Sequence, residues 1–128
     1  MGRGGTPSGP ARPAPSPERA LLDLVGLAAR AGALVHGTDA TRRAVREGSV
    51  LLVLVAGDAA AGQMGKLLPL LEARGVPYAS TLSRAALGAA TGREFVSAIG
   101  ITQDGFARRA RQLATALATQ QELTNGEI

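Results

Sequence analysis

The sequence contains no cysteine, one histidine and few aromatic residues, which make up 2% of its 128 residues. The lack of cysteine excludes disulfides, cysteine zinc sites and thiol nucleophiles. The single His36 excludes metal sites built from several histidines, and no nucleophile is spaced to partner it. The three aromatic residues, Tyr78, Phe95 and Phe106, occupy positions typical of structural side chains, which argues against a base-stacking surface of exposed rings. We therefore expect no catalysis, no metal and no small-molecule cofactor.

Long apolar runs are also absent. No stretch approaches the about 20 apolar residues that cross a membrane. The arginines near the N-terminus are followed by no apolar segment, which a secretory signal would require. We therefore expect a cytoplasmic protein with no membrane partner.

Hydrophobic residues make up 45% of the chain, and the net charge is +4. The length suits one compact domain whose core is built from Ala, Leu and Val. A positive balance favours an acidic partner such as nucleic acid, although many small soluble proteins are mildly basic without one. Charge alone leaves these two interpretations equally open.

Composition divides the chain into three parts. Residues 1–16 are rich in Gly, Pro and Ala and cannot bury enough apolar surface to fold, so we expect a disordered tail. Residues 17–118 carry the apolar periodicity of one domain, which we expect to be monomeric. Residues 119–128 turn polar and should fray.

The apolar periodicity predicts alternating helices and strands. Ser16 and Pro17 mark the start of a helix, and a central strand over 49–56 should be buried on both faces. Asp58 should cap the helix that follows, and Pro69 should kink that helix or lie near its first turns. The expected helices are 17–31, 38–47, about 58–74, 84–91 and from 103 onward, and the expected strands are 33–36, 49–56, 76–79 and 95–101. This alternation predicts an α/β fold with helices on both faces of a sheet.

The stretch from Val35 to Gly48 is the first candidate site. A short strand runs into Gly37, and a helix then begins at Thr38 with three arginines in its first turns: Arg42, Arg43 and Arg46. Free N–H groups and the dipole at a helix start can hold a phosphate or the polar edges of bases. Asp39 can pair with Arg43, can accept from the N–H groups of a guanine edge, or can stabilise the helix dipole. The plainer alternative for the arginines is a solvated helix face.

The loop Gly57–Lys66 follows the central strand and invites comparison with a P-loop. In a P-loop, lysine and then Ser or Thr directly follow the second glycine. Here Gln63 and Met64 stand in those places, so a permissive turn between strand and helix is the favoured interpretation.

Six blocks of sequence, in order, resemble the bacterial YlxQ-type proteins of the kink-turn-binding ribosomal protein superfamily (the L-seven-Ae and L-thirty-e group). The blocks are Leu24–Gly32, Gly37–Asp39 with Arg43, Val53–Asp58, Leu68–Leu71 through Val76–Tyr78, Ser83 through Leu87–Gly88 to Gly92, and Asp104–Ala107. The resemblance implies a three-layer α-β-α sandwich with a small mixed sheet, which binds structured RNA. In the kink-turn binders, a Gly-Thr-Asn-Glu-x-x-Lys run reads tandem sheared G·A pairs.

Carried over by this resemblance, Gly37 and Thr38 match the family residues, Asp39 replaces Asn, and Arg43 replaces Lys. Ala40 occupies the Glu position and cannot accept a hydrogen bond from guanine. The resemblance also assigns the loop before the short helix to a flipped-out base, where Leu82 would pack, beside Ser83, and Arg84 would reach a phosphate. The plainer alternative for this loop is a turn with a Ser cap. The candidate RNA-binding residues are Gly37, Thr38, Asp39, Arg42, Arg43, Arg46, Leu82, Ser83 and Arg84.

The expected partner is a structured RNA, either a kink-turn or a related internal loop, with ribosomal RNA or the ribosome as the foremost candidate. Two alternatives remain open. The chain could be an accessory RNA-binding module of an RNA-modifying enzyme, or a protein–protein module of ribosome assembly or translation that meets an acidic partner through Arg108, Arg109 and Arg111.

Overall fold

Residues 16–126 fold into five helices alternating with four strands. This computed structural model describes residues 16–126, with side chains for residues 16–120. The elements are α1 Pro17–Arg30, β1 Leu34–His36, α2 Thr38–Arg46, β2 Leu52–Val55, α3 Ala61–Arg74, β3 Tyr78–Ser80, α4 Arg84–Thr91, β4 Ala98–Ile101 and α5 Asp104–Gly126. Their order confirms the predicted α/β alternation.

The four strands form one mixed sheet in the order β1-β4-β2-β3. Strand β4 runs antiparallel to β1 and β2, whereas β2 and β3 are parallel. Strands β1, β2 and β3 therefore all point in one direction. Their carboxyl ends and the beginning of β4 meet at the same edge of the sheet, which we call the site edge.

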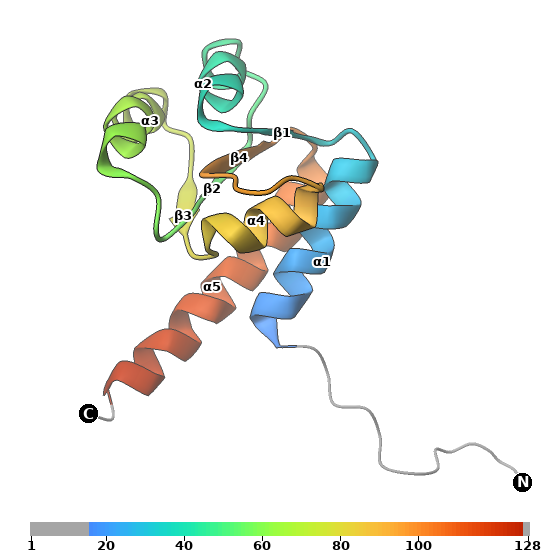
Figure 1. Cartoon of the computed structure of the whole chain (residues 1–128), viewed down its shortest axis with the longest axis vertical. Coiled ribbons are helices and arrows are strands. Elements are labelled where there is room, and N and C mark those ends of the chain that lie inside the picture. The colour runs from blue at the N-terminus through green and yellow to red at the C-terminus, as the bar shows by residue number, and fades with distance from the viewer. Residues whose placement is uncertain (1–15, 127–128) are drawn as a thin grey trace, which may run out of the picture.

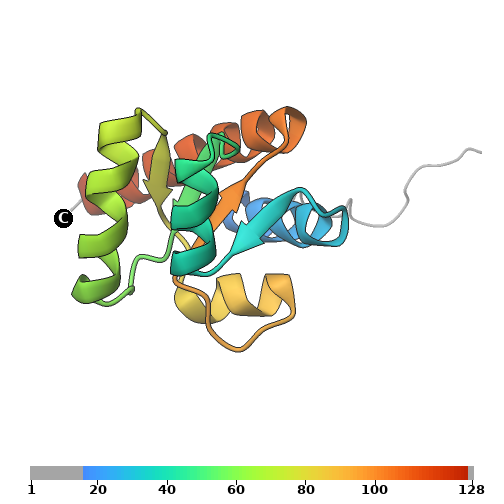
Figure 2. The same cartoon turned by 90° about the horizontal axis from the view of Figure 1, so that it is seen from above.

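Helices cover both faces of the sheet (Figures 1 and 2). Because side chains alternate along a strand, Leu52 and Leu54 of β2 pack in one core with α1, α4 and α5. Val53 and Val55 point the other way and pack with α2 and α3. All four residues are buried, so β2 is covered on both faces as predicted. This arrangement confirms the three-layer α-β-α sandwich.

Two of the expected helix caps are present. The Ser16 hydroxyl accepts from the N–H of Arg19 at 3.2 Å and opens α1. The Ser83 hydroxyl accepts from the N–H of Ala86 at 3.0 Å and opens α4, which ends at Gly92 in a left-handed conformation. Local capping chemistry therefore placed these boundaries correctly.

The cap expected at Asp58 was wrong. Helix α3 begins at Ala61, and its N-cap residue Ala60 provides no side-chain hydrogen bond. The Asp58 carboxylate instead accepts from the N–H of Arg84 at 2.8 Å, at the start of α4. Pro69 lies inside α3, well beyond the first turn where one alternative placed it. The sequence could not show that the loop carrying Asp58 folds toward α4, because that contact spans 26 residues.

The last strand also differs from the expectations. Residues 93–97 form a loop, and β4 begins only at Ala98, because the N–H of Val96 donates to the carbonyl of Arg84 rather than to a strand. Helix α5 continues to Gly126, and no Pro or Gly interrupts residues 119–125. The expected fraying of the C-terminal end stays a prediction. No helix within residues 16–126 is long and apolar enough to cross a membrane. The expected tail lies outside the described residues, apart from Ser16.

Candidate nucleic-acid interface

Four connections meet at the site edge. They are the junction of β1 with α2, the loop from β2 to α3, the loop from β3 to α4, and the α4–β4 loop over residues 92–97. In open α/β sheets, the carboxyl ends of parallel strands are where ligands bind. The topology therefore brings both stretches singled out in the sequence to one edge, although more than 30 residues separate them along the chain.

Gly37 shapes the junction between β1 and α2. Its backbone has φ 97° and ψ 149°, a conformation that glycine adopts readily and that residues with a side chain rarely adopt. Its N–H donates to the carbonyl of Ala98 at 2.8 Å, which fixes the junction to the start of β4. As N-cap residue it supplies no side chain, so the first turn of α2 begins without a side-chain cap. The free N–H groups of this turn are the helix-start feature that the sequence predicted.

The charged residues of α2 differ in how available they are. Asp39, with 85% of its side chain exposed, pairs with Arg42 at 4.0 Å, so the expected Asp39–Arg43 pair was wrong. Arg42 is only 26% exposed, and its Nε is buried without a hydrogen-bond partner. Arg43 and Arg46 are exposed, and their side chains form no ion pair within the described part of the chain. These two are the arginines most open to an anion.

The inner face of α2 anchors it to the sheet. Thr38 and Thr41 are buried, together with Ala44 and Val45. The inner face expected from the sequence, Thr41, Ala44 and Val45, is confirmed. Because Thr38 is 7% exposed, it can meet a ligand chiefly through its backbone.

The loop from β3 to α4 does not present the residue expected to cover a base. Leu82 is 2% exposed and belongs to the core beneath α1 and α5, so its side chain faces inward in this structure. Its packing on a flipped-out base stays a prediction that would require the leucine to turn outward. Ser83 is exposed but serves as the cap of α4. The resemblance located this loop at the site edge but could not show which way the leucine turns.

Arg84 is held at the site edge by Asp58. Its N–H donates to one Asp58 oxygen, and its Nε lies 3.5 Å from the other. The backbone hydrogen bond from Arg84, helped by the guanidinium charge, lowers the pKa of the Asp58 carboxyl. The rest of the guanidinium remains available, since about 44% of the side chain is exposed.

Sequence reasoning missed the α4–β4 loop. Phe95, expected to be structural, is 62% exposed, and the centroid of its ring lies 5.7 Å from the Arg84 guanidinium carbon, a cation–π contact. In the same loop, Arg93 Nε donates to His36 Nε2 at 3.0 Å. This hydrogen bond connects the α4–β4 loop to the end of β1. The one available signal was a phenylalanine set directly after two charged residues, Arg93 and Glu94, which is unusual for a core position.

These contacts join the four connections into one surface. Asp58 holds Arg84, Arg84 lies over Phe95, Arg93 holds His36, and Gly37 follows His36 into α2. The surface offers free N–H groups, exposed guanidinium groups, the exposed carboxylates of Asp39, Asp58 and Glu94, and one exposed ring. Phosphates, base edges and base faces are the ligand groups that these features recognise.

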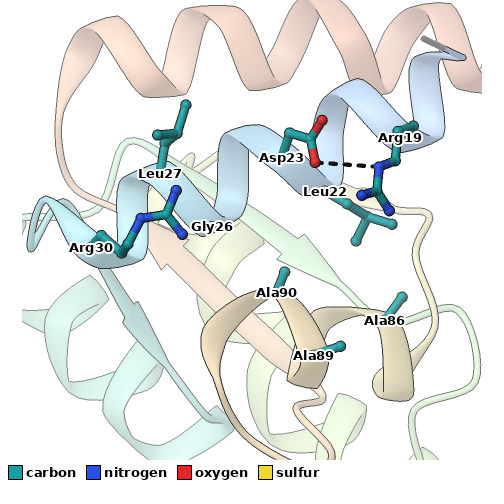
Figure 3. Close-up of a pocket in the computed structure, with 9 residues that line it drawn as sticks. All are labelled: Arg19, Leu22, Asp23, Gly26, Leu27, Arg30, Ala86, Ala89 and Ala90. Atoms are coloured by element: carbon teal, nitrogen blue, oxygen red, sulfur yellow. Dashed lines mark ion pairs between the residues drawn. The ribbon is translucent and has the colours of Figure 1, made fainter.

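A groove lies away from this surface. An open groove of ≈ 540 Å³ runs between α1 and α4 (Figure 3). The Arg19–Asp23 ion pair, at 3.4 Å, lies at one end of the groove and Arg30 at the other, with the alanines of α4 facing α1 between them. None of its lining residues belongs to the four connections at the site edge.

Comparison with known proteins agrees with this arrangement. Residues 19–111 match the Ribosomal protein L7Ae/L30e/S12e/Gadd45 family. The chain belongs to this family. It is 35% identical over 86 residues to the RNA-binding protein YlxQ of Bacillus subtilis (strain 168), covering 67% of this chain and 86% of YlxQ.

Two solved structures resemble this L7Ae-family chain. A protein of unknown function from Bacillus halodurans C matches with a TM-score of 0.71 and 35% identity, covering 74% of this chain and 96% of the other. The Giardia lamblia 15.5kD RNA binding protein matches with a TM-score of 0.68 and 25% identity, covering 80% and 88%. Proteins of this ribosomal type are non-enzymatic, so the family bears out the expectation that the chain is no enzyme.

Proposed function

We propose that this chain is a non-catalytic RNA-binding protein that recognises a structured RNA through the site edge. The observation that carries the proposal is the meeting of an uncapped helix start, exposed arginines and an exposed phenylalanine on one surface. Family membership and the similarity to RNA-binding relatives support the same partner class.

Each feature of the surface has a counterpart in RNA. Arg43 and Arg46 suit phosphates that follow the start of α2, because both are exposed and unpaired within residues 16–120. The Asp39 carboxylate can accept from the N–H groups of a guanine edge. Phe95 offers a face for one unstacked base, and unstacked bases occur in internal loops and bends rather than in continuous helices.

A kink-turn or a related internal loop is the proposed target, with ribosomal RNA or the ribosome as its cellular setting and a monomer in the cytoplasm as the acting form. The site would use fewer base contacts than the family pattern, since Ala40 stands where a glutamate would accept from guanine. A good base contact contributes about 1–3 kcal/mol of discrimination. Phe95 supplies contact area that can offset part of this loss.

The test is a gel-shift titration at near-physiological salt with two RNAs. One is a standard kink-turn, and the other has its sheared G·A pairs replaced by Watson–Crick pairs. We expect tighter binding to the intact kink-turn, because only bent, unstacked RNA can meet the start of α2 and Phe95 together. Equal binding to both RNAs would contradict recognition of the bend, and no binding to either would contradict the function.

Two variants locate the binding surface. Arg43→Ala removes an exposed arginine from α2 and should weaken binding to the kink-turn. Arg111→Ala removes an exposed arginine from α5, in the other helical layer, and is the matched control for net charge. Equal losses from both variants would mean that diffuse charge, rather than the site edge, holds the RNA.

A further inference from the structure

Gly88, in the middle of α4, lies directly beneath the α4–β4 loop. A Cβ built at this position would lie 2.6 Å from the carbonyl carbon of Glu94 and 2.9 Å from the carbonyl oxygen of Arg93. Real Cβ atoms essentially never approach other atoms below 3.0 Å. The opposing atoms belong to the backbone, so no side-chain rotation can relieve the overlap. Any residue other than glycine at this position must push the loop away from α4.

The loop is attached to its surroundings on both sides of this contact. The N–H of Arg93 donates to the carbonyl of Gly88 at 2.7 Å, and the N–H of Val96 donates to the carbonyl of Arg84 at 3.1 Å. The Arg93 side chain reaches across to His36 of β1. The loop therefore lies flat on α4 and bridges to the start of α2, and Phe95 stands between its two backbone bonds to α4.

Glycine weakens the interior of a helix relative to alanine, and α4 has only eight residues. The backbone of Gly88 has ordinary helical angles that any residue could adopt. The close approach of the loop is therefore the structural reason for a glycine at this position. The same approach brings the Phe95 ring over Arg84, which lies one turn of α4 before Gly88.

We propose that Gly88 is a positioning residue of the RNA-binding surface: its missing side chain sets the seat of the α4–β4 loop and so the places of Arg93 and Phe95. The effect on RNA rests on the proposed function. The seating of the loop does not, and it can be measured on the free protein.

The experiment compares Gly88→Ala with Gly65→Ala. Gly65 is the matched control, a glycine inside α3 whose added Cβ would meet no atom within 4 Å. Amide hydrogen exchange of Arg93 and Val96 reports the seating of the loop, and gel-shift titration with the kink-turn RNA reports binding. We expect Gly88→Ala to lower protection at both amides and to weaken RNA binding by at least roughly fivefold, as loss of one stacked base would. Gly65→Ala should change neither.

A double variant separates positioning from a general loss of folding. If Gly88 acts through the loop, Gly88→Ala combined with Phe95→Ala should bind RNA no more weakly than the worse single variant. Additive losses would overturn the proposal, and so would unchanged protection at Arg93 and Val96 in Gly88→Ala. If Phe95→Ala and Arg43→Ala both leave RNA binding intact, the proposed function fails, and amide protection alone decides the role of Gly88.

A second variant covers the case in which Gly88→Ala does not fold. One glycine inserted after Glu94 lengthens the loop and leaves α4 untouched. This variant should keep the unfolding temperature of the parent within a few degrees and weaken kink-turn binding as much as Phe95→Ala does. Full RNA binding by the insertion variant would overturn the proposal.

Discussion

Phe95 is the most exposed of the large hydrophobic residues in the described part of the chain. A large ring that is 62% exposed contributes little to the core, and its contact with Arg84 leaves much of its surface in water. Cation–π pairs at exposed sites are worth about 0.5–1 kcal/mol. Stacking of a base on an aromatic side chain is worth about 1–3 kcal/mol. The larger of these two energies belongs to the RNA complex, so Phe95 should matter more for binding than for folding.

Replacing Phe95 with alanine should therefore weaken kink-turn binding by about 5- to 150-fold, the equivalent of one stacked base. The free energy of unfolding should change by no more than about 1 kcal/mol, because the exposed cation–π pair with Arg84 is the contact that is lost. Tyr78→Ala is the matched control, because Tyr78 is the other exposed aromatic residue and lies on β3 with its hydroxyl bonded to Glu72. Titration calorimetry and urea unfolding measure the two quantities. A large loss of stability with unchanged RNA affinity would contradict this role.

Asp58 links stability to pH. Because its pKa is lowered in the folded protein by the Arg84 backbone N–H, the folded state favours the charged carboxylate. The stabilisation is therefore present above the ordinary pKa of an aspartate and is lost as the pH falls through the lower folded value. We expect Asp58→Asn to unfold at a lower temperature than the parent at pH 7, and the difference to vanish in acid.

Thermal unfolding followed by circular dichroism between pH 7 and pH 2 tests this dependence. Asp23→Asn is the control, because Asp23 makes only an exposed ion pair with Arg19 and has no backbone bond to a helix start. A difference between parent and Asp58→Asn that persists unchanged at the lowest pH would show that the contact does not depend on charge.

At the scale of elements, α3 tolerates a proline that should interrupt it. Pro69 lies inside the helix and has no N–H to donate to the preceding turn. Pro69 lies on the exposed face of α3. Leu67 and Leu71, two residues before and after it, are fully buried against β2. Burial of a leucine contributes about 1.5–3 kcal/mol, which is comparable to the about 3 kcal/mol that proline costs a helix relative to alanine. Packing therefore keeps a helix that propensity alone would break.

Pro69→Ala should raise the free energy of unfolding by about 1–3 kcal/mol, because it restores a backbone hydrogen bond without touching the core. The greater freedom of alanine in the unfolded chain reduces the gain by less than about 1 kcal/mol. Pro77→Ala is the control, since Pro77 lies in the connection before β3, outside any helix, and its carbonyl bond to Val53 is retained. Urea unfolding measures both variants. No gain from Pro69→Ala would mean that α3 is already relaxed around the ring.

At the scale of the whole molecule, the +4 charge draws RNA of any sequence, and the site edge selects among the RNAs that arrive. Contacts to phosphates release counterions and carry no sequence information, so their loss should be equal for all RNAs. If the RNA lies along the site edge, exposed arginines there contact phosphates and those on α5 do not. Removing an arginine at the site edge should then cost more affinity than removing one on α5.

Arg46→Ala should reduce the slope of log K against log salt by about 0.7–0.9, the value for one phosphate contact. It should weaken binding equally for the kink-turn and its Watson–Crick counterpart. Arg108→Ala is the control, because Arg108 is paired with Asp104 at 3.0 Å on α5 and should leave the slope unchanged. Filter binding over a series of salt concentrations measures the slope. A selective loss for the kink-turn would reassign Arg46 from phosphate to base recognition.

Much of the fold was readable from local chemistry. The Ser16 and Ser83 caps and the unbroken apolar run of β2 are short-range signals, and each of them was found in the structure. Short-range signals also located the helix start after Gly37, since a glycine followed by a helix-forming stretch is visible in the sequence. Whether the nine proposed site residues bind RNA is still a prediction.

The sequence by itself determined the order of elements, the two-sided burial of β2 and the basic helix start, because these depend on neighbours within a few residues. Only the tertiary structure decided that Asp58 accepts from the first N–H of α4 rather than capping α3, that Leu82 turns inward and that Phe95 turns outward. Each of these outcomes depends on contacts between segments far apart in the chain, such as the approach of the α4–β4 loop to Gly88 and of Arg93 to His36. Local propensity carries no information about such contacts, because their partners are brought together only when the sheet forms.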